Sequence, residues 1–199
     1  MTSAVDTKLS LETGQALLSL ARHSIAEQLE GDGNLELLNQ ETKTILEAPI
    51  LQEKRGTFVT LHKHGALRGC IGSLTSEEPL VDNVKHNAVN AAFRDPRFPP
   101  LSQDELPEVS IEVSILSQPA PLNYSGPEQL LEILKADKPG LIVKKGFKQA
   151  TFLPQVWSQL PQAEDFLGHL CLKAGLPQEA WRSGDLEILV YHVQDFSES

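Results

Sequence analysis

The sequence predicts an α+β fold in which a mostly antiparallel sheet is flanked by helices. Helical and strand patterns are interleaved along the chain without the regular rhythm of a parallel β–α–β protein. The expected strands alternate apolar and polar residues, as Val109–Leu116 does, which is typical of antiparallel sheets with one exposed face. Two segments, at 56–74 and 140–153, also have the pattern of a β-hairpin with glycine at the bend.

Length and composition narrow the class of protein. The chain of 199 residues is long enough for one domain, or one domain of two lobes, with a buried core. The chain has no run of about 18 apolar residues, which a membrane-spanning helix would need. Its first residues also lack the features of a secretory signal. A formal charge of −10 argues against a general nucleic-acid or anionic-membrane binder. Cys70 and Cys171 form no disulfide framework, which indicates a cytoplasmic protein with reduced thiols.

The first predicted element is an amphipathic helix over 10–30, capped by Ser10 and stopped by Gly31. Its apolar residues recur at spacings of three and four, so we expect it to cover one face of a sheet. A turn is expected next, at 31–34. Residues 35–51 are expected to form a short helix or an irregular connection, because a proline at position 49 prevents a regular helical end.

The hairpin at 56–74 contains the most unusual stretch of the chain. At 67–72 an arginine, a cysteine and two glycines follow one another within six positions. Because side chains alternate along a strand, Arg68, Cys70 and Gly72 are expected on one face. Such a face combines a cation with a thiol and marks the first candidate site.

The length of the hairpin loop decides which residues oppose each other. A two-residue loop would mix charged and apolar side chains on one face. A three-residue loop over 64–66 separates an apolar face from a polar one, so we expect that register. In it His62 faces Arg68 and Thr60 faces Cys70.

A helix is predicted over 75–93, with a proline in its first turn and an alanine-rich stripe that permits close approach to a sheet. It ends in the proline-rich loop 94–100, since the prolines exclude further helix. This loop is suited to hold the charged groups of Arg94, Asp95 and Arg97 in fixed positions. The alternative is an Arg–Asp ion pair that merely fastens the loop.

The remaining segments predict two more helices, the second hairpin and a last strand. Ser125–Glu128 has the spacing of a capping box before a leucine-rich helix. Gly175 is expected to end a further helix that buries Cys171 on its apolar side. The last strand is expected over 186–193, followed by a frayed acidic end over 195–199.

Five motifs occur in order along the chain and together resemble one protein family. They are Phe58–Leu61, Leu67–Gly72, Ala91–Pro100, Glu112–Ser114 and Phe152–Val156. This set resembles the AMMECR domain family, whose prokaryotic members are called protein A of the AmmeMemoRadiSam system. The resemblance runs over 10–196.

The resemblance carries expectations about fold and partners. It implies a single domain of two lobes, the larger built from the N- and C-terminal parts of the chain and the smaller from an internal segment. A cleft is expected between the lobes near 67–72, and residues 1–9 and 197–199 are expected to be disordered tails. The resemblance also implies gene association with a Memo-like protein and a radical-SAM protein, with which the protein is expected to act. It supplies no reaction, so whether the protein is an enzyme stays open.

Cys70 is the candidate nucleophile. Only the thiolate attacks, and nearby cations such as Arg68 with Arg94 or Arg97 would stabilise it. His62, diagonal to the cysteine in the expected register, could act as the base. The alternative is that this thiol is buried as a small apolar group.

The two glycines beside the cysteine also have two interpretations. Gly69 and Gly72 would let the backbone approach a ligand, whose anionic oxygens could accept amide hydrogens. Glycine in a strand also marks a bulge or tight packing. We favour the ligand, because an arginine and a thiol lie in the same stretch.

The sequence thus predicts a site for a small anionic ligand, anchored by Arg68, Arg94 and Arg97, with Asp95 orienting an arginine. No histidine or cysteine spacing matches a metal site, and no phosphate-loop or dinucleotide fingerprint indicates a cofactor. Two alternatives remain: a cysteine-dependent enzyme, and an adaptor module without chemistry. The lysines at 144–148 are interpreted as ordinary surface charges.

Overall fold

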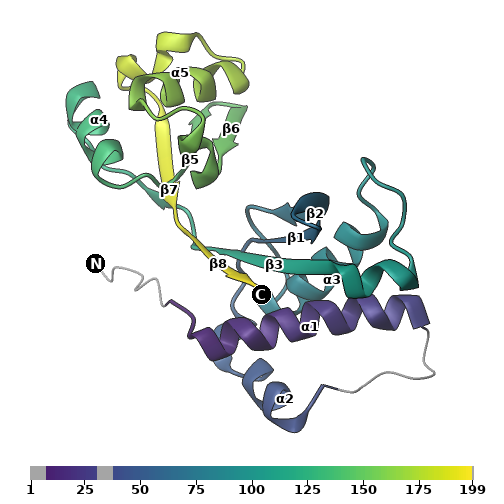
Figure 1. The fold of residues 1–199 in the computed structure, drawn as a ribbon. Coiled ribbons are helices and arrows are strands. Elements are labelled where there is room, and N and C mark those ends of the chain that lie inside the picture. The colour runs from purple at the N-terminus through teal and green to yellow at the C-terminus, as the bar shows by residue number, and fades with distance from the viewer. Residues whose placement is uncertain (1–7, 31–37, 199) are drawn as a thin grey trace. The chain divides into compact units, whose positions relative to one another are not determined.

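The computed structural model describes residues 8–30 and 38–198, and the chain divides into two compact units (Figure 1). The first unit consists of residues 1–116 and 194–199, and the second of residues 117–193. Each unit has its own hydrophobic core and its own four-stranded antiparallel sheet. The predicted α+β class is therefore confirmed. The predicted cleft concerns the placement of the two lobes relative to each other, and it stays a prediction.

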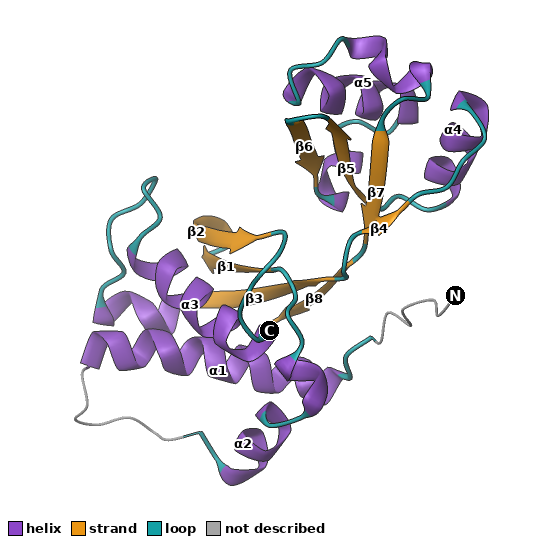
Figure 2. Ribbon diagram, turned by 180° about the vertical axis from the view of Figure 1, so that it is seen from behind, coloured by secondary structure: helices purple, strands orange, loops and turns teal. Residues whose placement is uncertain are grey.

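The first unit is a sheet of strand order β2–β1–β3–β8 with helices α1 and α3 packed on one face (Figure 2). The helix expected at 10–30 covers the sheet as predicted, and Ser10 caps it by accepting a hydrogen bond from the Thr13 amide at 3.1 Å. The elements of this unit are α1 (Leu11–Glu30), α2 (Gln40–Leu46), η1 (Pro49–Gln52), β1 (Thr57–Lys63), β2 (Ala66–Ser73), α3 (Leu80–Phe93), η2 (Gln103–Glu108), β3 (Val109–Leu116) and β8 (Val193–Ser197). The predicted stop at Gly31 and the turn at 31–34 lie outside the described residues.

The bend of the β1–β2 hairpin is tighter than expected. Lys63 pairs with Ala66 around a loop of two residues. His64 (φ 53°) and Gly65 (φ 77°) both have the positive φ that a type I′ turn requires. The predicted three-residue loop is therefore wrong, because this turn reverses the chain in two residues.

Beyond the bend, the hairpin returns to the predicted register. A β-bulge interrupts the pairing between Leu61 and His62 of β1. Arg68 is the extra residue of β2 at this point and has no partner on β1. From there on Thr60 opposes Cys70, as predicted. The predicted pairing of His62 with Arg68 is wrong. The two-residue turn fixes the register of the pairs next to it, and burial of the apolar face fixes the register of the rest of the hairpin. The two registers differ by one residue, and the bulge joins them.

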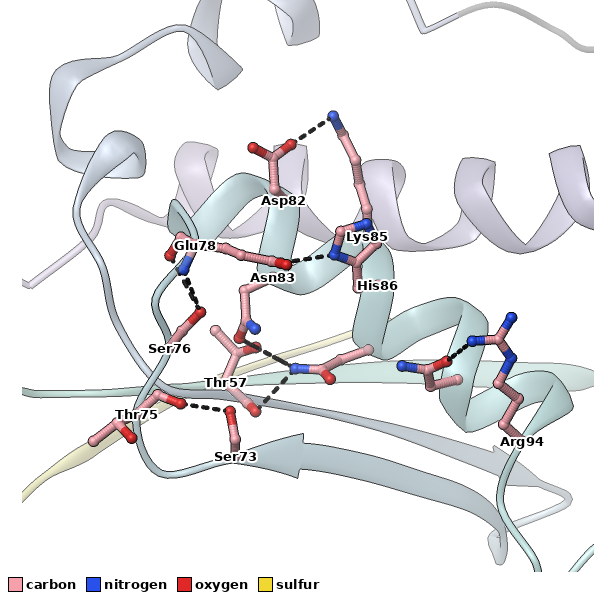
Figure 3. Close-up of polar contacts among 12 residues, drawn as sticks. Thr57, Ser73, Thr75, Ser76, Glu78, Asp82, Asn83, Lys85, His86 and Arg94 are labelled. Atoms are coloured by element: carbon pink, nitrogen blue, oxygen red, sulfur yellow. Dashed lines mark hydrogen bonds and ion pairs between the residues drawn. The ribbon is translucent and has the colours of Figure 1, made fainter.

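A buried polar network fastens α3 to the sheet (Figure 3). Asn87 Nδ2 donates to the Thr57 hydroxyl at 2.9 Å and to Asn83 Oδ1 at 3.2 Å. The Thr57 hydroxyl in turn donates to Asn83 Oδ1 at 2.5 Å. Buried polar groups need such partners, so the network fixes the helix above one end of β1.

The C-terminal strand is part of the folded unit. The predicted last strand over 186–193 is two strands, β7 (Glu187–Tyr191) in the second unit and β8 in the first, with a break at His192. The prediction of a frayed end over 195–199 is wrong for residues 195–198. The Phe196 ring packs onto Gly14 of α1. Leu9 is also buried, so it and β8 belong to the fold and not to the predicted tails.

The second unit surrounds a sheet of order β4–β7–β5–β6. Cys171 is completely buried in its core, as predicted. The capping box predicted at Ser125–Glu128 is wrong, because Gly126 is the N-cap and no side chain bonds to it. Besides β7, the second unit contains β4 (Ala120–Pro121), α4 (Pro127–Ala136), β5 (Gly140–Lys145), β6 (Lys148–Phe152), η3 (Pro154–Ser158), α5 (Ala163–Lys173) and η4 (Gln178–Ser183).

Two of the lysines at 144–148 make the ordinary surface contacts that the sequence predicts for them. Lys145 forms an ion pair with Asp185 at 2.5 Å, and Lys148 donates to the Gly175 carbonyl at 2.6 Å. Within residues 8–30 and 38–198, no helix combines the length and hydropathy needed to cross a bilayer.

Candidate functional site

The bulge in β2 gives Arg68 an environment that the sequence did not predict. Its side chain is 9% exposed and forms a two-pronged ion pair with Glu105 of η2, through Nε at 3.3 Å and Nη2 at 3.0 Å. Nη2 also donates to the Pro99 carbonyl at 3.0 Å. Lys63, an inward-facing neighbour, binds the same carboxylate at 3.2 Å. Arg68 is therefore grouped with Lys63 and Glu105, because a bulge re-aims a strand side chain.

Glu105 is held ionised by these partners. It belongs to a capping box in which its carboxylate accepts from the Ser102 amide. The hydrogen bond from Arg68 lowers the pKa of Glu105 to about 2, helped by Ser102 and Lys63 and opposed by burial. The carboxylate thus stays charged at neutral pH and cannot serve as a proton donor there.

One nitrogen of Arg68 has no partner. Nη1 is buried and makes no hydrogen bond among the described residues. The Phe98 ring lies next to the guanidinium, with its centroid 5.8 Å from Cζ of Arg68 and 5.5 Å from Cζ of Arg97. A buried cationic donor without an acceptor is uncommon and calls for an explanation.

Asp95 fastens the loop 94–100 to the edge of the sheet. Its Oδ2 accepts from the Cys70 amide at 2.9 Å and from Arg97 Nη2 at 2.6 Å, and its Oδ1 accepts from the Arg97 amide and Nε. The Arg97 hydrogen bond holds the pKa of Asp95 far below its usual range. The same bond raises the pKa of Arg97. The ion pair considered from the sequence is therefore present, and Asp95 orients an arginine.

The same loop closes the open edge of β2. Arg97 Nη2 reaches the Cys70 carbonyl at 3.3 Å while Asp95 takes the Cys70 amide. Both outward backbone groups of this residue are thus satisfied by side chains, which protects an edge strand from pairing with another chain. Arg97 remains half exposed, since 52% of its side chain is accessible.

Cys70 is half-buried, with a defined polar neighbour. The Thr60 hydroxyl donates to its sulfur at 3.3 Å across the two strands. The side chain of His62, further along β1, forms no hydrogen bond with another described residue. The base that the sequence proposed is therefore not hydrogen-bonded to the thiol, and Thr60 is the residue that bonds to it.

The glycines of this stretch are required by packing. A Cβ on Gly69 would lie 2.2 Å from the Ala91 carbonyl oxygen of α3. A Cβ on Gly72 would lie 2.2 Å from the Thr57 carbonyl oxygen and 2.5 Å from the Phe58 ring. Close approach of neighbouring groups accounts for both glycines, and their part in ligand binding stays a prediction.

Arg94 is separate from the other two arginines. It is exposed and donates to the Asn90 side chain of its own helix at 3.3 Å (Figure 3). This contact is an ordinary surface bond between residues four apart. The structure therefore brings Arg68 and Arg97 together at Phe98, and Arg97 also contacts the Cys70 carbonyl. We call these four residues the β2 corner.

Sequence reasoning missed three side chains in this region, namely Phe98, Glu105 and Glu112. The Ser102–Glu105 spacing is that of a capping box and could have located Glu105. Glu112 of β3 is paired with Thr60 of β1, and the alternation of side chains along the strands could have predicted that they share a face. No cluster of three or more potential metal ligands is found in the described part of the chain.

The chain is similar to known proteins over most of its length. A family profile described as AMMECR1 matches residues 18–196. A protein from Methanothermobacter thermautotrophicus is 37% identical over 191 residues, which are 96% of each chain. A protein from Methanopyrus kandleri is 41% identical over 202 residues, 96% of this chain and 91% of the other.

A solved structure has the same fold. The crystal structure of an uncharacterized protein from Pyrococcus horikoshii matches with a TM-score of 0.75 and 36% identity. The match covers 97% of this chain and 95% of that one. None of these names states an activity, so the chemistry must be argued from the residues.

Proposed function

The chain belongs to the AMMECR1 family, and from this premise we propose that it binds a small anionic ligand at the β2 corner. Arg68 and Arg97 supply the positive charge, and both guanidinium groups lie near the Phe98 ring, with Cζ at 5.8 Å and 5.5 Å from its centroid. Asp95 and Glu105 orient these arginines and do not touch the ligand. The protein acts together with Memo-like and radical-SAM proteins, as the family resemblance implies.

The observation that carries this proposal is the unsatisfied Nη1 of Arg68. Leaving a buried donor without an acceptor costs about 1–3 kcal/mol, and more for a charged group. A carboxylate or phosphate oxygen would provide the missing acceptor, and guanidinium groups bind both strongly. Arg68 is therefore able to gain a bond when an anion binds.

Titration calorimetry with inorganic phosphate and with succinate tests the proposal. Arg68→Lys keeps the positive charge but removes the planar guanidinium with its several N–H donors. We expect its Kd for the anion to rise about tenfold, which is a loss of about 1.4 kcal/mol of binding free energy. Arg94→Gln is the matched control and should bind as the wild type does. If the wild type binds neither anion, or if Arg94→Gln weakens binding as much as Arg68→Lys, the β2 corner is not an anion site.

The partner part of the proposal has its own test. Purified Memo-like and radical-SAM proteins are mixed with the chain and analysed by sedimentation velocity. A complex with either protein supports joint action. Three species that sediment independently, with and without phosphate, would contradict a direct complex and leave only association in the genome.

A second candidate function is covalent chemistry at Cys70, favoured by the hydroxyl that Thr60 donates to its sulfur. Such a bond stabilises negative charge on sulfur. Iodoacetamide labelling followed by mass spectrometry compares Cys70 with Cys171 in the folded protein, where burial raises the pKa of Cys171. We expect Cys70 to react first, and Thr60→Val to slow it. Equal protection of both thiols would exclude a nucleophile and leave the adaptor function.

A further inference from the structure

A row of polar side chains crosses the face of the first sheet that is opposite to α1 and α3. We call this the outer face. Thr60 stands in the middle of the row, with Cys70 opposite it on β2 and Glu112 opposite it on β3. The inward neighbours Val59 and Leu61 are completely buried, so alternation puts Thr60 on the outer face.

The two ends of the row carry opposite charges. Arg97 lies at the β2 end, where it contacts the Cys70 carbonyl. Glu112 lies at the β3 end. Neighbouring strands are about 4.8 Å apart, so the row from β2 to β3 spans about 10 Å. That separation fits a small molecule with charged groups at both ends.

The carboxylate of Glu112 has room for a further partner. Among residues 8–30 and 38–198, its side chain accepts one weak hydrogen bond, from the Ser197 hydroxyl at 3.4 Å. It is half-buried, and no cation lies within ion-pair distance of it in the described chain. This contrasts with Asp95 and Glu105, whose charges are both neutralised by arginine.

A purely anionic ligand fits this arrangement poorly. The Debye length is about 8 Å at physiological ionic strength, so the charge of Glu112 acts on groups bound at its own end and in the middle of the row. It repels a second negative charge and attracts a positive one. The ring of Phe58, whose residue is also on the outer face beside Gly72, offers an apolar surface to the middle of a ligand.

We infer that the ligand is an amino acid-like zwitterion, with its anionic group on Arg97 of the β2 corner and its ammonium group on Glu112. This inference rests on the proposed function, since the anionic end occupies the anion site. It adds the requirement for a cationic end and names the residue that recognises it. Thr60 and Phe58 contact the carbon chain between the two charged groups.

Two probes that differ in one group separate the charges. Hexanoate carries the carboxylate alone, and 6-aminohexanoate adds an ammonium group at the other end of the chain. We expect the wild type to bind 6-aminohexanoate about tenfold more tightly than hexanoate in titration calorimetry. Glu112→Gln, which keeps the shape and the Ser197 contact, should bind both probes equally. Glu187→Gln, at an exposed glutamate of β7, is the matched control and should keep the tenfold preference.

The outcomes distinguish this inference from the proposed function. If the wild type binds both probes equally, or prefers hexanoate, the inference is overturned while the anion site stands. It is also overturned if Glu112→Gln weakens both probes alike or keeps the preference. If neither probe binds the wild type, the anion site is contradicted for carboxylates and the inference falls with it.

Discussion

Two arginine–carboxylate pairs in the first unit look alike and differ in one respect. Arg22 of α1 binds Glu198 through Nε at 2.7 Å and Nη2 at 2.5 Å, and it donates to the carbonyls of Leu106 and Val109. Arg68 binds Glu105 in the same two-pronged manner and also donates to a backbone carbonyl. All three nitrogens of Arg22 have acceptors, whereas Nη1 of Arg68 is buried without one.

The difference indicates which pair is structural. Glu198 also accepts the Ile111 amide at 2.8 Å, so the Arg22 pair joins α1, β3 and the C-terminal strand. The hydrogen bond that Arg22 donates to Glu198 raises the pKa of Arg22, which stays charged. A pair that satisfies every donor needs nothing more. A pair that leaves one donor unsatisfied gives up stability, and a ligand can recover it.

Removing Arg22 should produce the largest loss of stability. Arg22→Ala leaves Glu198 without its cation and removes one donor from each of two carbonyls, and breaking a buried pair costs about 3–5 kcal/mol. Since 34% of the Arg22 side chain is exposed, we expect a smaller loss, of about 2 kcal/mol in urea denaturation. Lys54→Ala, in the exposed pair with Glu77, is the control and should change stability by less than about 0.5 kcal/mol. An equal effect of both variants would contradict the structural role of Arg22.

Replacing each arginine by lysine sharpens the comparison. Arg22→Lys loses acceptor contacts at all three nitrogens, and we expect it to lower stability by about 1.5 kcal/mol. Arg68→Lys loses the contacts of two nitrogens, because the third has no partner, and Lys63 still neutralises Glu105, so a loss of about 1 kcal/mol is expected. The effect of phosphate on the Tm of thermal unfolding distinguishes the two lysine variants further. Phosphate should raise the Tm of Arg22→Lys as it does that of the wild type, but not that of Arg68→Lys. The reverse pattern would place the anion site at Arg22.

Much of the first unit could be predicted from alternation and helical spacing. The outward position of Cys70 and its pairing with Thr60 follow from the burial of the apolar face, which any register must respect. The environment of Arg68 could not be predicted, because a bulge depends on the turn and the core together. A single extra residue moved this arginine from the thiol to Glu105.

The end of the chain was mispredicted for a related reason. An acidic C-terminal segment has the composition of a solvated tail. Its Phe196 and Glu198 find their partners, Gly14 and Arg22, at the far end of the sequence. Contacts over such separations leave no local pattern. The proposed zwitterion site has the same property, since only the sheet places Arg97 and Glu112 at the two ends of one row.

The pH dependence of stability tests the Glu105 half of the comparison. The pKa of Glu105 is lowered from an ordinary 4.5 to about 2, so its ionised form stabilises the folded state. This contribution is complete above pH 4.5 and is lost as pH falls toward about 2. Glu105→Gln lacks it at every pH. We expect a gap of about 1 kcal/mol between wild type and variant at neutral pH, closing toward pH 2, measured by urea denaturation across the range. A gap that stays constant with pH would mean that the ionised carboxylate contributes nothing.

Arg94→Gln should have the smallest effect, and this expectation separates geometry from sequence pattern. The sequence alone gives Arg94, Arg68 and Arg97 equal standing as anion anchors. In the structure Arg94 is exposed, and its bond to Asn90 is worth a few tenths of a kcal/mol. We therefore expect a change in stability below about 0.5 kcal/mol and an unchanged phosphate affinity. If phosphate binding instead fell as it does in Arg68→Lys, the anion would be held by the general charge of the loop, and the unsatisfied nitrogen of Arg68 would lose its significance.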